Sequence, residues 1–318
     1  MFVLLGVGAV ILLLVVVAGF GALFAVRSAP PVAPVVVKPV VPAATTATPT
    51  AKASAAPELA KLVKSMGSAG TGPGQLDDAR SLAVDLDENV YVADYSDGRV
   101  QKLDKDGKFA WIASLSKNSF SGDLNVFGLA CDTKGTLWVN RRGDLVKLST
   151  KDGSTLATIK GDYDHTWFEY IAIAPTGEMI SLHSAAGDTD FLRLDANAKV
   201  TSRVKNKDAA GLAIDGKKNA YLIERFPDAI EVLDEKNGVV AKFGSKDDLS
   251  SPDAIAVDGN GHVFVAMSGG VAIFDARGKL LGKIKTAYGR AIAISNSGKL
   301  FVLSNKSSID VYELGKID

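Results

Sequence analysis

The chain has 318 residues and a formal net charge of zero, with 36 Lys and Arg side chains against 36 Asp and Glu. This balance argues against nucleic acid as a partner, because proteins that bind nucleic acid usually carry a basic surface. The single cysteine, Cys131, excludes an internal disulfide and a zinc site built from several cysteines. A histidine-rich metal centre would need all three histidines of the chain in one place.

The first 26 residues form a continuous apolar segment that contains no charged side chain. Its length exceeds the roughly 20 residues that an apolar helix needs to cross a bilayer. A cleavable signal peptide would begin with basic residues and have a shorter apolar core, and this segment has neither feature. We therefore expect residues 1–26 to be an uncleaved, single-pass transmembrane anchor. A buried helix of a soluble domain is the alternative.

Residues 27–57 are rich in Pro, Ala and Thr. Such a segment cannot bury a core and is typical of an extended, semi-rigid linker. Three basic residues, Arg27, Lys38 and Lys52, follow the apolar segment, so the positive-inside rule favours a cytoplasmic location for the rest of the chain. A Pro/Ala/Thr-rich stalk is, however, typical of domains presented outside the cell. We slightly favour the extracytoplasmic side.

A short apolar motif occurs six times in the remainder of the chain, at intervals of about 40 residues, which is typical of propeller blades. The copies read SLAVD, GLACD, YIAIA, GLAID, AIAVD and AIAIS, and end at Asp85, Asp132, Ala174, Asp215, Asp258 and Ser295. Each copy is followed by two more apolar runs rich in β-branched and aromatic residues, and most copies by a weaker fourth run. Each unit therefore predicts four antiparallel strands.

An alanine occupies the same position in the first run of every unit. These alanines are Ala83, Ala130, Ala172, Ala213, Ala256 and Ala293. In a propeller the first strands converge on the axis, where a larger side chain would be overpacked. The pattern therefore predicts an all-β, six-bladed β-propeller with these alanines on its innermost strands.

The two ends of the repeat region predict how the ring closes. The last unit ends after its third strand, at IDVYEL (309–314), so its blade lacks a fourth strand. Residues 58–67, ELAKLVKSMG, have the apolar residues of a strand and the lysines of a solvated edge. We expect them to supply that strand, which removes exposed sheet edges. The propeller is then one domain, residues 58–318.

The first unit resembles the repeat of the NHL family. Residues 70–109, GTGPGQLDDARSLAVDLDENVYVADYSDGRVQKLDKDGKF, contain a glycine-rich lead, an apolar run ending in Asp, a YVAD run, an RVQ run and a DxxGK turn. The later units resemble this pattern more loosely. The resemblance implies a six-bladed propeller, and such propellers serve as protein-binding, ligand-sensing or RNA-binding modules, while related ones are enzymes. Asp94 belongs to the repeat pattern, and we expect it to be structural.

One turn of the fifth unit looks like a metal site, because Asp258, Asn260 and His262 are spaced like ligands. The aligned turns indicate a hairpin instead. Four of them begin with Asp, and four have Gly at a position that requires a positive φ, which Glu88 and Lys218 fill in the others. We therefore expect a turn capped by Asp258, with His262 exposed and no metal.

Binding in propellers is concentrated on the face formed by the inter-blade loops and the second-to-third-strand loops. Charged and aromatic residues that differ between the units occupy these positions here, as a specific polar ligand would require. The candidate binding residues are Arg80, Arg141, Arg142, Trp167, His183, Glu224, Arg225, Asp253, Tyr288 and Arg290. We predict non-catalytic recognition of a protein, a peptide or a small polar ligand, with no cofactor. An ordinary solvated rim is the alternative.

The enzymatic alternative is a metal-dependent hydrolase or lyase of the lactonase-like six-bladed type. Lactonases of this kind bind a divalent metal through one Glu, two Asn and one Asp, and Glu169 and Asp253 lie at strand starts. Arg80, however, opens the first blade where a Glu would be needed, and no Asn pair is found. Arg80 and Arg290 would also repel a cation. The sequence contains no nucleophile elbow, P-loop or dinucleotide fingerprint.

Overall fold

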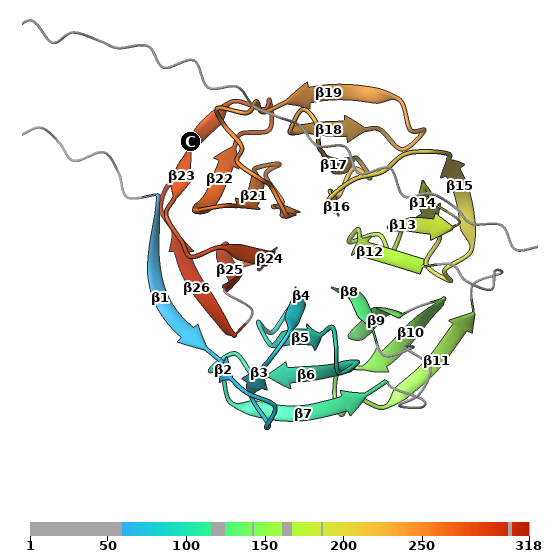
Figure 1. The fold of residues 1–318 in the computed structure, drawn as a ribbon, viewed down its shortest axis with the longest axis vertical. Helices are drawn as coiled ribbons and strands as arrows, with labels where there is room; N and C mark the ends of the chain where they lie inside the picture. The colour runs from blue at the N-terminus through green and yellow to red at the C-terminus, as the bar shows by residue number, and fades with distance from the viewer. Residues whose placement is uncertain are drawn as a thin grey trace, which may run out of the picture. The chain divides into compact units, whose positions relative to one another are not determined.

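The computed structural model describes residues 59–115, 125–141, 143–160, 167–185, 187–304 and 307–317. They fold into six four-stranded antiparallel sheets, which surround a central axis as the blades of a β-propeller (Figure 1). The prediction of an all-β, six-bladed propeller is confirmed. Among the described residues, no helix has the length and apolar character that would be needed to span a bilayer. The predicted anchor (1–26) and linker (27–57) lie outside these residues.

The first three blades follow one another along the chain, and each runs from its innermost to its outermost strand. Blade 1 contains β4 (Ala79–Val84), β5 (Val90–Asp94), β6 (Arg99–Leu103) and β7 (Phe109–Ser114). Blade 2 contains β8 (Val126–Cys131), β9 (Thr136–Arg141), β10 (Asp144–Ser149) and β11 (Thr155–Lys160). Blade 3 contains β12 (Trp167–Ile173), β13 (Met179–Ala185), β14 (Asp188–Leu194) and β15 (Val200–Val204).

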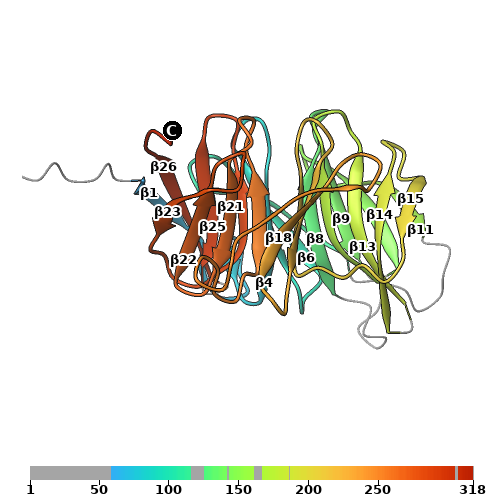
Figure 2. The ribbon, with the colours of Figure 1, turned by 90° about the horizontal axis from the view of Figure 1, so that it is seen from above.

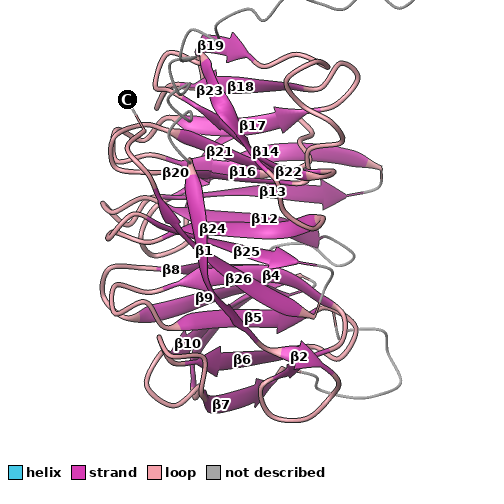
Figure 3. Ribbon diagram, turned by 90° about the vertical axis from the view of Figure 1, so that its left-hand side faces the viewer, coloured by secondary structure: helices cyan, strands magenta, loops and turns pink. Residues whose placement is uncertain are grey.

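The last three blades complete the ring. Blade 4 contains β16 (Leu212–Ile214), β17 (Ala220–Glu224), β18 (Ala229–Leu233) and β19 (Val239–Phe243). Blade 5 contains β20 (Ala254–Val257), β21 (Val263–Met267), β22 (Gly270–Phe274) and β23 (Leu280–Ile284). Blade 6 contains β24 (Gly289–Ile294), β25 (Lys299–Ser304), β26 (Ser308–Leu314) and, as its outer strand, β1 (Ala60–Met66). Figure 3 shows these strands joined by loops.

The N-terminal strand closes the ring as the sequence predicted. β1 pairs antiparallel with β26, from Ala60 opposite Leu314 to Met66 opposite Ile309. At one end of this pair the backbone N–H of Gly315 donates to the carbonyl of Leu59 at 2.9 Å. Blade 6 is therefore built from both ends of the propeller, and β26 has no open edge.

The core is divided among the contacts between neighbouring blades, whose sheets stand side by side in Figure 2. Each of the six blade-to-blade contacts holds its own cluster of buried apolar residues. Between blades 5 and 6, for example, Phe264 packs with Ile292 and Val302. The second strands β5 and β21 are buried on both sides, whereas the side chains of the outer strand β11 are exposed or partly exposed to solvent. This burial explains why second strands such as β5 and β21 are mostly apolar, while β11 carries polar side chains.

The RVQ run of blade 1 holds the glycine-rich segment that leads from β1 into the ring. The Arg99 guanidinium donates to the Asp94 carboxylate at 2.6 Å and to the carbonyl of Gln75 at 3.2 Å. Gln101 donates to the same carbonyl at 2.7 Å and accepts from the N–H of Gly74 at 2.9 Å. This segment also forms a two-residue parallel pair, β2 (Ser68–Ala69) with β3 (Gln75–Leu76). Asp94 is buried in this network, which supports its predicted structural role.

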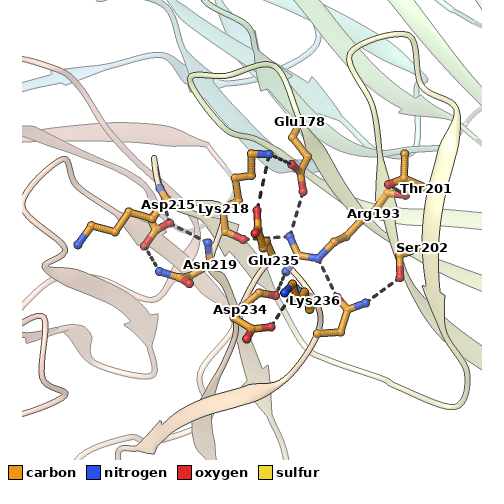
Figure 4. Close-up of polar contacts among 12 residues, drawn as sticks. Glu178, Arg193, Thr201, Ser202, Asp215, Lys218, Asn219, Asp234, Glu235 and Lys236 are labelled. Atoms are coloured by element: carbon orange, nitrogen blue, oxygen red, sulfur yellow. Dashed lines mark hydrogen bonds and ion pairs between the residues drawn. The ribbon is translucent and has the colours of Figure 1, made fainter.

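A second buried arginine joins blade 3 to blade 4 on the side of the first-to-second-strand turns (Figure 4). Arg193 of β14 donates to the carbonyls of Lys218 at 2.9 Å and Asp234 at 2.6 Å, and to Asn237 Oδ1 at 2.7 Å. Its guanidinium also lies 3.2 Å from the Glu178 carboxylate. Three of these partners belong to turns of blade 4, so one side chain fixes two turns of the neighbouring blade.

The turn that resembled a metal site is a hairpin. Asp258 Oδ1 accepts hydrogen bonds from the N–H groups of Asn260 at 2.9 Å and His262 at 2.8 Å. Glu88 and Lys218 adopt positive φ angles of 64° and 68° at the position that glycine fills in other turns. The hairpin prediction is confirmed. The exposure predicted for His262 is wrong, because its side chain is 16% exposed and its Nδ1 lies 2.8 Å from Asp258 Oδ2.

Candidate functional site

A narrow channel follows the propeller axis. It has a volume of about 250 Å³ and is lined by the innermost strands of all six blades. Among the lining residues are the six predicted alanines, Ala83, Ala130, Ala172, Ala213, Ala256 and Ala293. Their small methyl groups let the six strands approach the axis together, so the wall of the channel is mainly apolar away from its mouth.

At the mouth of the channel, where the innermost strands begin, lies a second cavity of about 230 Å³. Its lining residues are Arg80, Tyr95, Phe127, Glu169, Tyr170, Asp253 and Arg290. Three of the predicted binding residues, Arg80, Asp253 and Arg290, therefore meet in one cavity. They share it with three aromatic side chains and with the carboxylate of Glu169.

β-Bulges position most of these side chains. The pairing of the first and second strands skips Arg80 in blade 1, Phe127 in blade 2 and Arg290 in blade 6. In blade 3 the pairing skips both Glu169 and Tyr170. A bulge leaves the extra residue outside the ladder and re-aims its side chain. Four of the six blades thus use an irregular strand start to direct a large side chain into the mouth.

Arg80 is held firmly on one wall of the mouth. Its Nε and Nη2 donate to the two carboxylate oxygens of Asp78 at 3.0 and 2.8 Å. Its guanidinium carbon lies 3.8 Å from the ring centroid of Tyr95, a cation–π geometry. Tyr95 in turn packs edge-on against Phe127, with ring centroids 5.3 Å apart, and accepts a hydrogen bond from Asn125. This wall is preorganised, because each of its side chains is fixed by the next.

Arg290 and Glu169 differ from Arg80 in lacking a partner of opposite charge within the described residues. Arg290 lines the mouth and makes neither a hydrogen bond nor an ion pair with any other side chain that the structure describes. Glu169 accepts a hydrogen bond from the Ser184 hydroxyl at 2.8 Å, which orients its carboxylate without neutralising it. Both charges are thus open to a ligand.

Asp253 is already engaged at the edge of the mouth. It accepts a hydrogen bond from the Tyr288 hydroxyl at 2.9 Å and lies 3.4 Å from the Arg225 guanidinium. Burial and the negative charge of Asp253 together raise the pKa of the Tyr288 phenol. Tyr288 therefore remains a hydrogen-bond donor at neutral pH. The three predicted binding residues Arg225, Asp253 and Tyr288 form one connected group.

A third cavity, of about 330 Å³, adjoins the mouth beside blade 4. It is lined by Glu169, Tyr170, Asp208, Ala209, Ala210, Glu224 and Arg225. Glu224 accepts a hydrogen bond from Lys207 at 3.0 Å and forms an ion pair with Lys242 at 2.5 Å. Burial favours the neutral acid, but the bonds from Lys242 and Lys207 outweigh it and lower the pKa of Glu224. This predicted binding residue is therefore ionised and neutralised from within the domain.

Two predicted binding residues lie inside the blades rather than on the channel face. Arg141 is 7% exposed, donates to the carbonyl of Leu115 at 2.8 Å and forms an ion pair with Asp144. His183 is 4% exposed and packs edge-on against Phe168. Their burial removes both from the surface that a ligand can reach.

For the remaining two candidates, Arg142 and Trp167, the structure describes no side chain. Arg142 lies outside the described residues. Trp167 begins β12, where it is opposite Ser184, but its side chain is likewise outside the description. Tyr170 belongs to the mouth although we did not predict it. The sequence signal that could have identified it is its size, because the other five units have a small residue at this position: Ser81, Gly128, Gly211, Ala254 and Ala291.

Metal-binding potential at the mouth is limited to two carboxylates, Glu169 and Asp253. Throughout the described part of the chain, no group of three or more His, Cys, Asp or Glu side chains converges. Catalytic zinc sites typically use three protein ligands, and Arg80 and Arg290 beside these carboxylates would oppose a cation. The residues present therefore do not match the donor set of a catalytic metal site.

Sequence comparison finds no protein-family model and no curated protein that matches this chain. The resemblance to the NHL repeat therefore stays a prediction. Solved structures, in contrast, share the fold. A gluconolactonase from Xanthomonas campestris is 16% identical, has a TM-score of 0.60 and aligns over 80% of this chain and 99% of its own.

Two further structures show how widely this architecture is used. A virginiamycin B lyase from Staphylococcus aureus is 12% identical, with a TM-score of 0.56 over 77% of this chain and 82% of its own. The WD40 β-propeller domain of Doa1 is 15% identical, with a TM-score of 0.55 over 81% of this chain and 98% of its own. At these identities the likeness is one of fold alone. The chain thus shares the β-propeller fold with enzymes and with a WD40 domain, and the fold does not decide between their activities.

Proposed function

We propose that this protein is a non-catalytic recognition module and that the mouth of the channel is its binding site. One observation carries the proposal: the bulged strand starts aim Arg80, Phe127, Glu169, Tyr170 and Arg290 into a single cavity. A bulge interrupts the ladder, bends the strand and re-aims the extra residue. Its recurrence at the mouth supports a binding role for the side chains that it re-aims.

The chemistry of the mouth suits recognition. Arginine and tyrosine are, with tryptophan, the side chains enriched among the residues that contribute most to binding energy in interfaces, and each combines a large contact area with directional hydrogen bonds. Here they stand on a closed ring of sheets, so little ordering is needed when a ligand binds. A protein or peptide that inserts a side chain or an end, or a small polar ligand, would fit this arrangement.

The proposal predicts that binding depends on Arg290 and not on charge in general. Full-length wild type, Arg290→Gln and Lys285→Gln would be immobilised and exposed to a cell extract, and retained proteins and small molecules would be identified. Lys285 is an exposed residue of the preceding loop outside the mouth lining, so its substitution makes the same change in charge. At least one species retained by wild type and Lys285→Gln should be lost with Arg290→Gln. Equal retention by all three proteins would contradict the proposal.

The second candidate is a metal-dependent hydrolase or lyase that uses the same mouth. The observation in its favour is that Glu169 and Asp253 line one cavity, in a fold shared with a gluconolactonase and a lyase. Metal analysis of the purified full-length chain, before and after Glu169→Gln, separates the two candidates. A stoichiometric divalent metal that is lost with Glu169→Gln would favour the enzyme. Metal content independent of Glu169 would favour recognition without catalysis.

We further propose that residues 1–26 anchor the chain in a membrane and that residues 27–57 act as the linker to the propeller. The uncharged apolar run and the Pro/Ala/Thr-rich composition support this. We place the propeller on the extracytoplasmic side. Protease added to intact cells should then remove the propeller while cytoplasmic proteins survive. Protection of the propeller until the membrane is permeabilised would place it in the cytoplasm.

A further inference from the structure

The charges of the mouth are arranged with opposite signs on opposite sides of the ring. Neighbouring innermost strands contact each other in the order β4, β8, β12, β16, β20 and β24, and β24 contacts β4 again. Arg290 is the second residue of β24 in blade 6, and Glu169 lies in β12 of blade 3. These blades are three steps apart in either direction around a ring of six. The two residues therefore face the axis from opposite sides of the same cavity.

Arg290 and Glu169 are also the two mouth charges that the described residues leave without a counter-charge. Arg80 is matched by Asp78, and Asp253 is matched by Arg225. Glu169 is oriented by Ser184. A ligand with one charge would satisfy one side of the mouth and leave the other side uncompensated. A ligand with both charges would satisfy both sides at once.

Beneath the charged mouth the channel is lined mainly by apolar side chains. The mouth and the channel share Arg80, Phe127, Tyr170, Asp253 and Arg290, so they are continuous. Below these residues the wall consists mainly of alanine, leucine, isoleucine and valine residues of the inner strands. An apolar group of a ligand held at the mouth could enter this space and leave water.

The sizes of the two cavities limit the ligand. The mouth alone, at about 230 Å³, falls below the range of about 300–1,000 Å³ that is usual for pockets binding drug-sized molecules, and the channel adds about 250 Å³ behind it. The mouth therefore fits a small molecule or the end of a short chain. An amino acid or a short peptide with an apolar side chain has the required size, the two opposite charges and the apolar group.

From this geometry we propose that the mouth binds a small zwitterion with an apolar side chain, namely an amino acid or short peptide. Its carboxylate pairs with Arg290, its ammonium group pairs with Glu169, and its side chain enters the channel. The inference rests on the proposed function, since it assumes that the mouth is the binding site. It adds the chemical class of the ligand and the orientation in which it lies.

The test uses probes that remove one charge at a time. Leucine, leucyl-leucine and tri-leucine would be titrated into the full-length chain by calorimetry, together with the N-acetylated and the C-amidated form of each. We expect the free form of one probe to bind at least about tenfold more tightly than either capped form, because each cap leaves a charged group without its partner. The length of the tightest probe distinguishes an amino acid from a peptide.

Variants then assign each end of the ligand to one side chain. Arg290→Gln should bind the free and the C-amidated probe equally while still discriminating against the N-acetylated one. Glu169→Gln should show the reverse pattern. Lys285→Gln should keep both preferences. Unchanged melting temperatures would verify that all three variants are folded, and this crossed pattern is one that a merely structural role would not produce.

Two results would overturn the inference. Capped probes that bind wild type as tightly as the free form would show that the mouth does not recognise both the ammonium group and the carboxylate of the ligand. Absence of binding by every probe would exclude this ligand class. In either case the extract experiment tests the proposed function separately. A species that is lost only with Arg290→Gln would keep the mouth as a recognition site for another ligand. Equal retention by wild type, Arg290→Gln and Lys285→Gln would contradict the proposed function as well as this inference.

Discussion

His183 illustrates how the surroundings of a single residue set its chemistry. It lies near the end of the second strand of blade 3, packed against Phe168 with ring centroids 5.4 Å apart. Burial first, and then the positive charge of Arg203, lower the pKa of its imidazole, because both disfavour the imidazolium form. The folded protein therefore keeps His183 neutral at pH values where an exposed histidine takes up a proton.

This lowered pKa predicts a loss of stability in mild acid. The unfolded chain, with a histidine pKa near about 6.5, binds a proton that the folded chain does not, so the free energy of unfolding falls as the pH drops below about 6.5 toward the folded pKa. Thermal melts of wild type and His183→Gln between about pH 5 and pH 8 measure the effect. In the variant, stability should depend less steeply on pH, because His183 no longer contributes to the loss in acid. Identical slopes in both proteins would show that other groups cause the acid dependence.

Arg141 and Arg290 show why the site was only partly predictable residue by residue. Both are arginines at strand ends, and both were predicted to bind a ligand. Arg141 is neutralised by Asp144, which the sequence places three positions away, and its second partner is the Leu115 carbonyl of the preceding blade, to which it donates a hydrogen bond. The first partner could have been read from the sequence. The second could not, because it depends on how two blades pack.

The strands themselves were predictable because their apolar periodicity and turn residues recur in every unit. The bulges were not, because a bulge is one residue of mismatch between paired strands and leaves the alternation of the sequence almost unchanged. Tyr170 is the clearest case. The pairing of β12 with β13 skips Glu169 and Tyr170 on one strand but only Leu182 on the other, and this one-residue mismatch does not show in the sequence of either strand.

Contacts between elements predict a large effect for Arg193. Its replacement by methionine keeps an unbranched stem but removes the guanidinium, so the carbonyls of Lys218 and Asp234 lose this donor. We expect Arg193→Met to lower the free energy of unfolding by about 2–4 kcal/mol.

The matched control for this substitution is Arg203→Met. Arg203 is 32% exposed and its ion pair with Asp190 lies at the surface, so the expected loss is about 0–1 kcal/mol. Urea denaturation measures both variants. If Arg193→Met is no more destabilising than Arg203→Met, the contacts drawn in Figure 4 do not hold blades 3 and 4 together.

At the scale of the whole molecule, stability is shared among six similar contacts between blades, and the ring must be closed for all six to form. Closure could be predicted from the sequence because the last unit lacks a strand and the segment before the first unit can supply one. The charge pattern of the mouth could not, since residues about 120 positions apart face one another only once the ring exists.

Removing the closing strand tests this dependence. Deletion of residues 60–66 leaves β26 with an open edge and blade 6 with three strands. We expect a lower and broader melting transition and self-association through the exposed edge, measured by calorimetry and light scattering. A deletion of equal length in the linker, residues 43–49, should change neither. A sharp, monomeric transition without β1 would show that the ring is stable when open.

The pairing of β1 with β26 also determines how the ring responds to tension. The two strands are antiparallel, and their outer ends, Leu59 and Gly315, lie beside each other, joined by one hydrogen bond. A force that pulls the preceding chain away from the C-terminal end loads this bond first and then each later pair in turn, from Ala60 opposite Leu314 inward. Bonds that are loaded one at a time open at lower force than bonds that are sheared together. The pairing of β1 with β26 therefore resists thermal opening through many hydrogen bonds, yet a pulling force can separate the two strands one pair at a time, starting from Leu59 and Gly315.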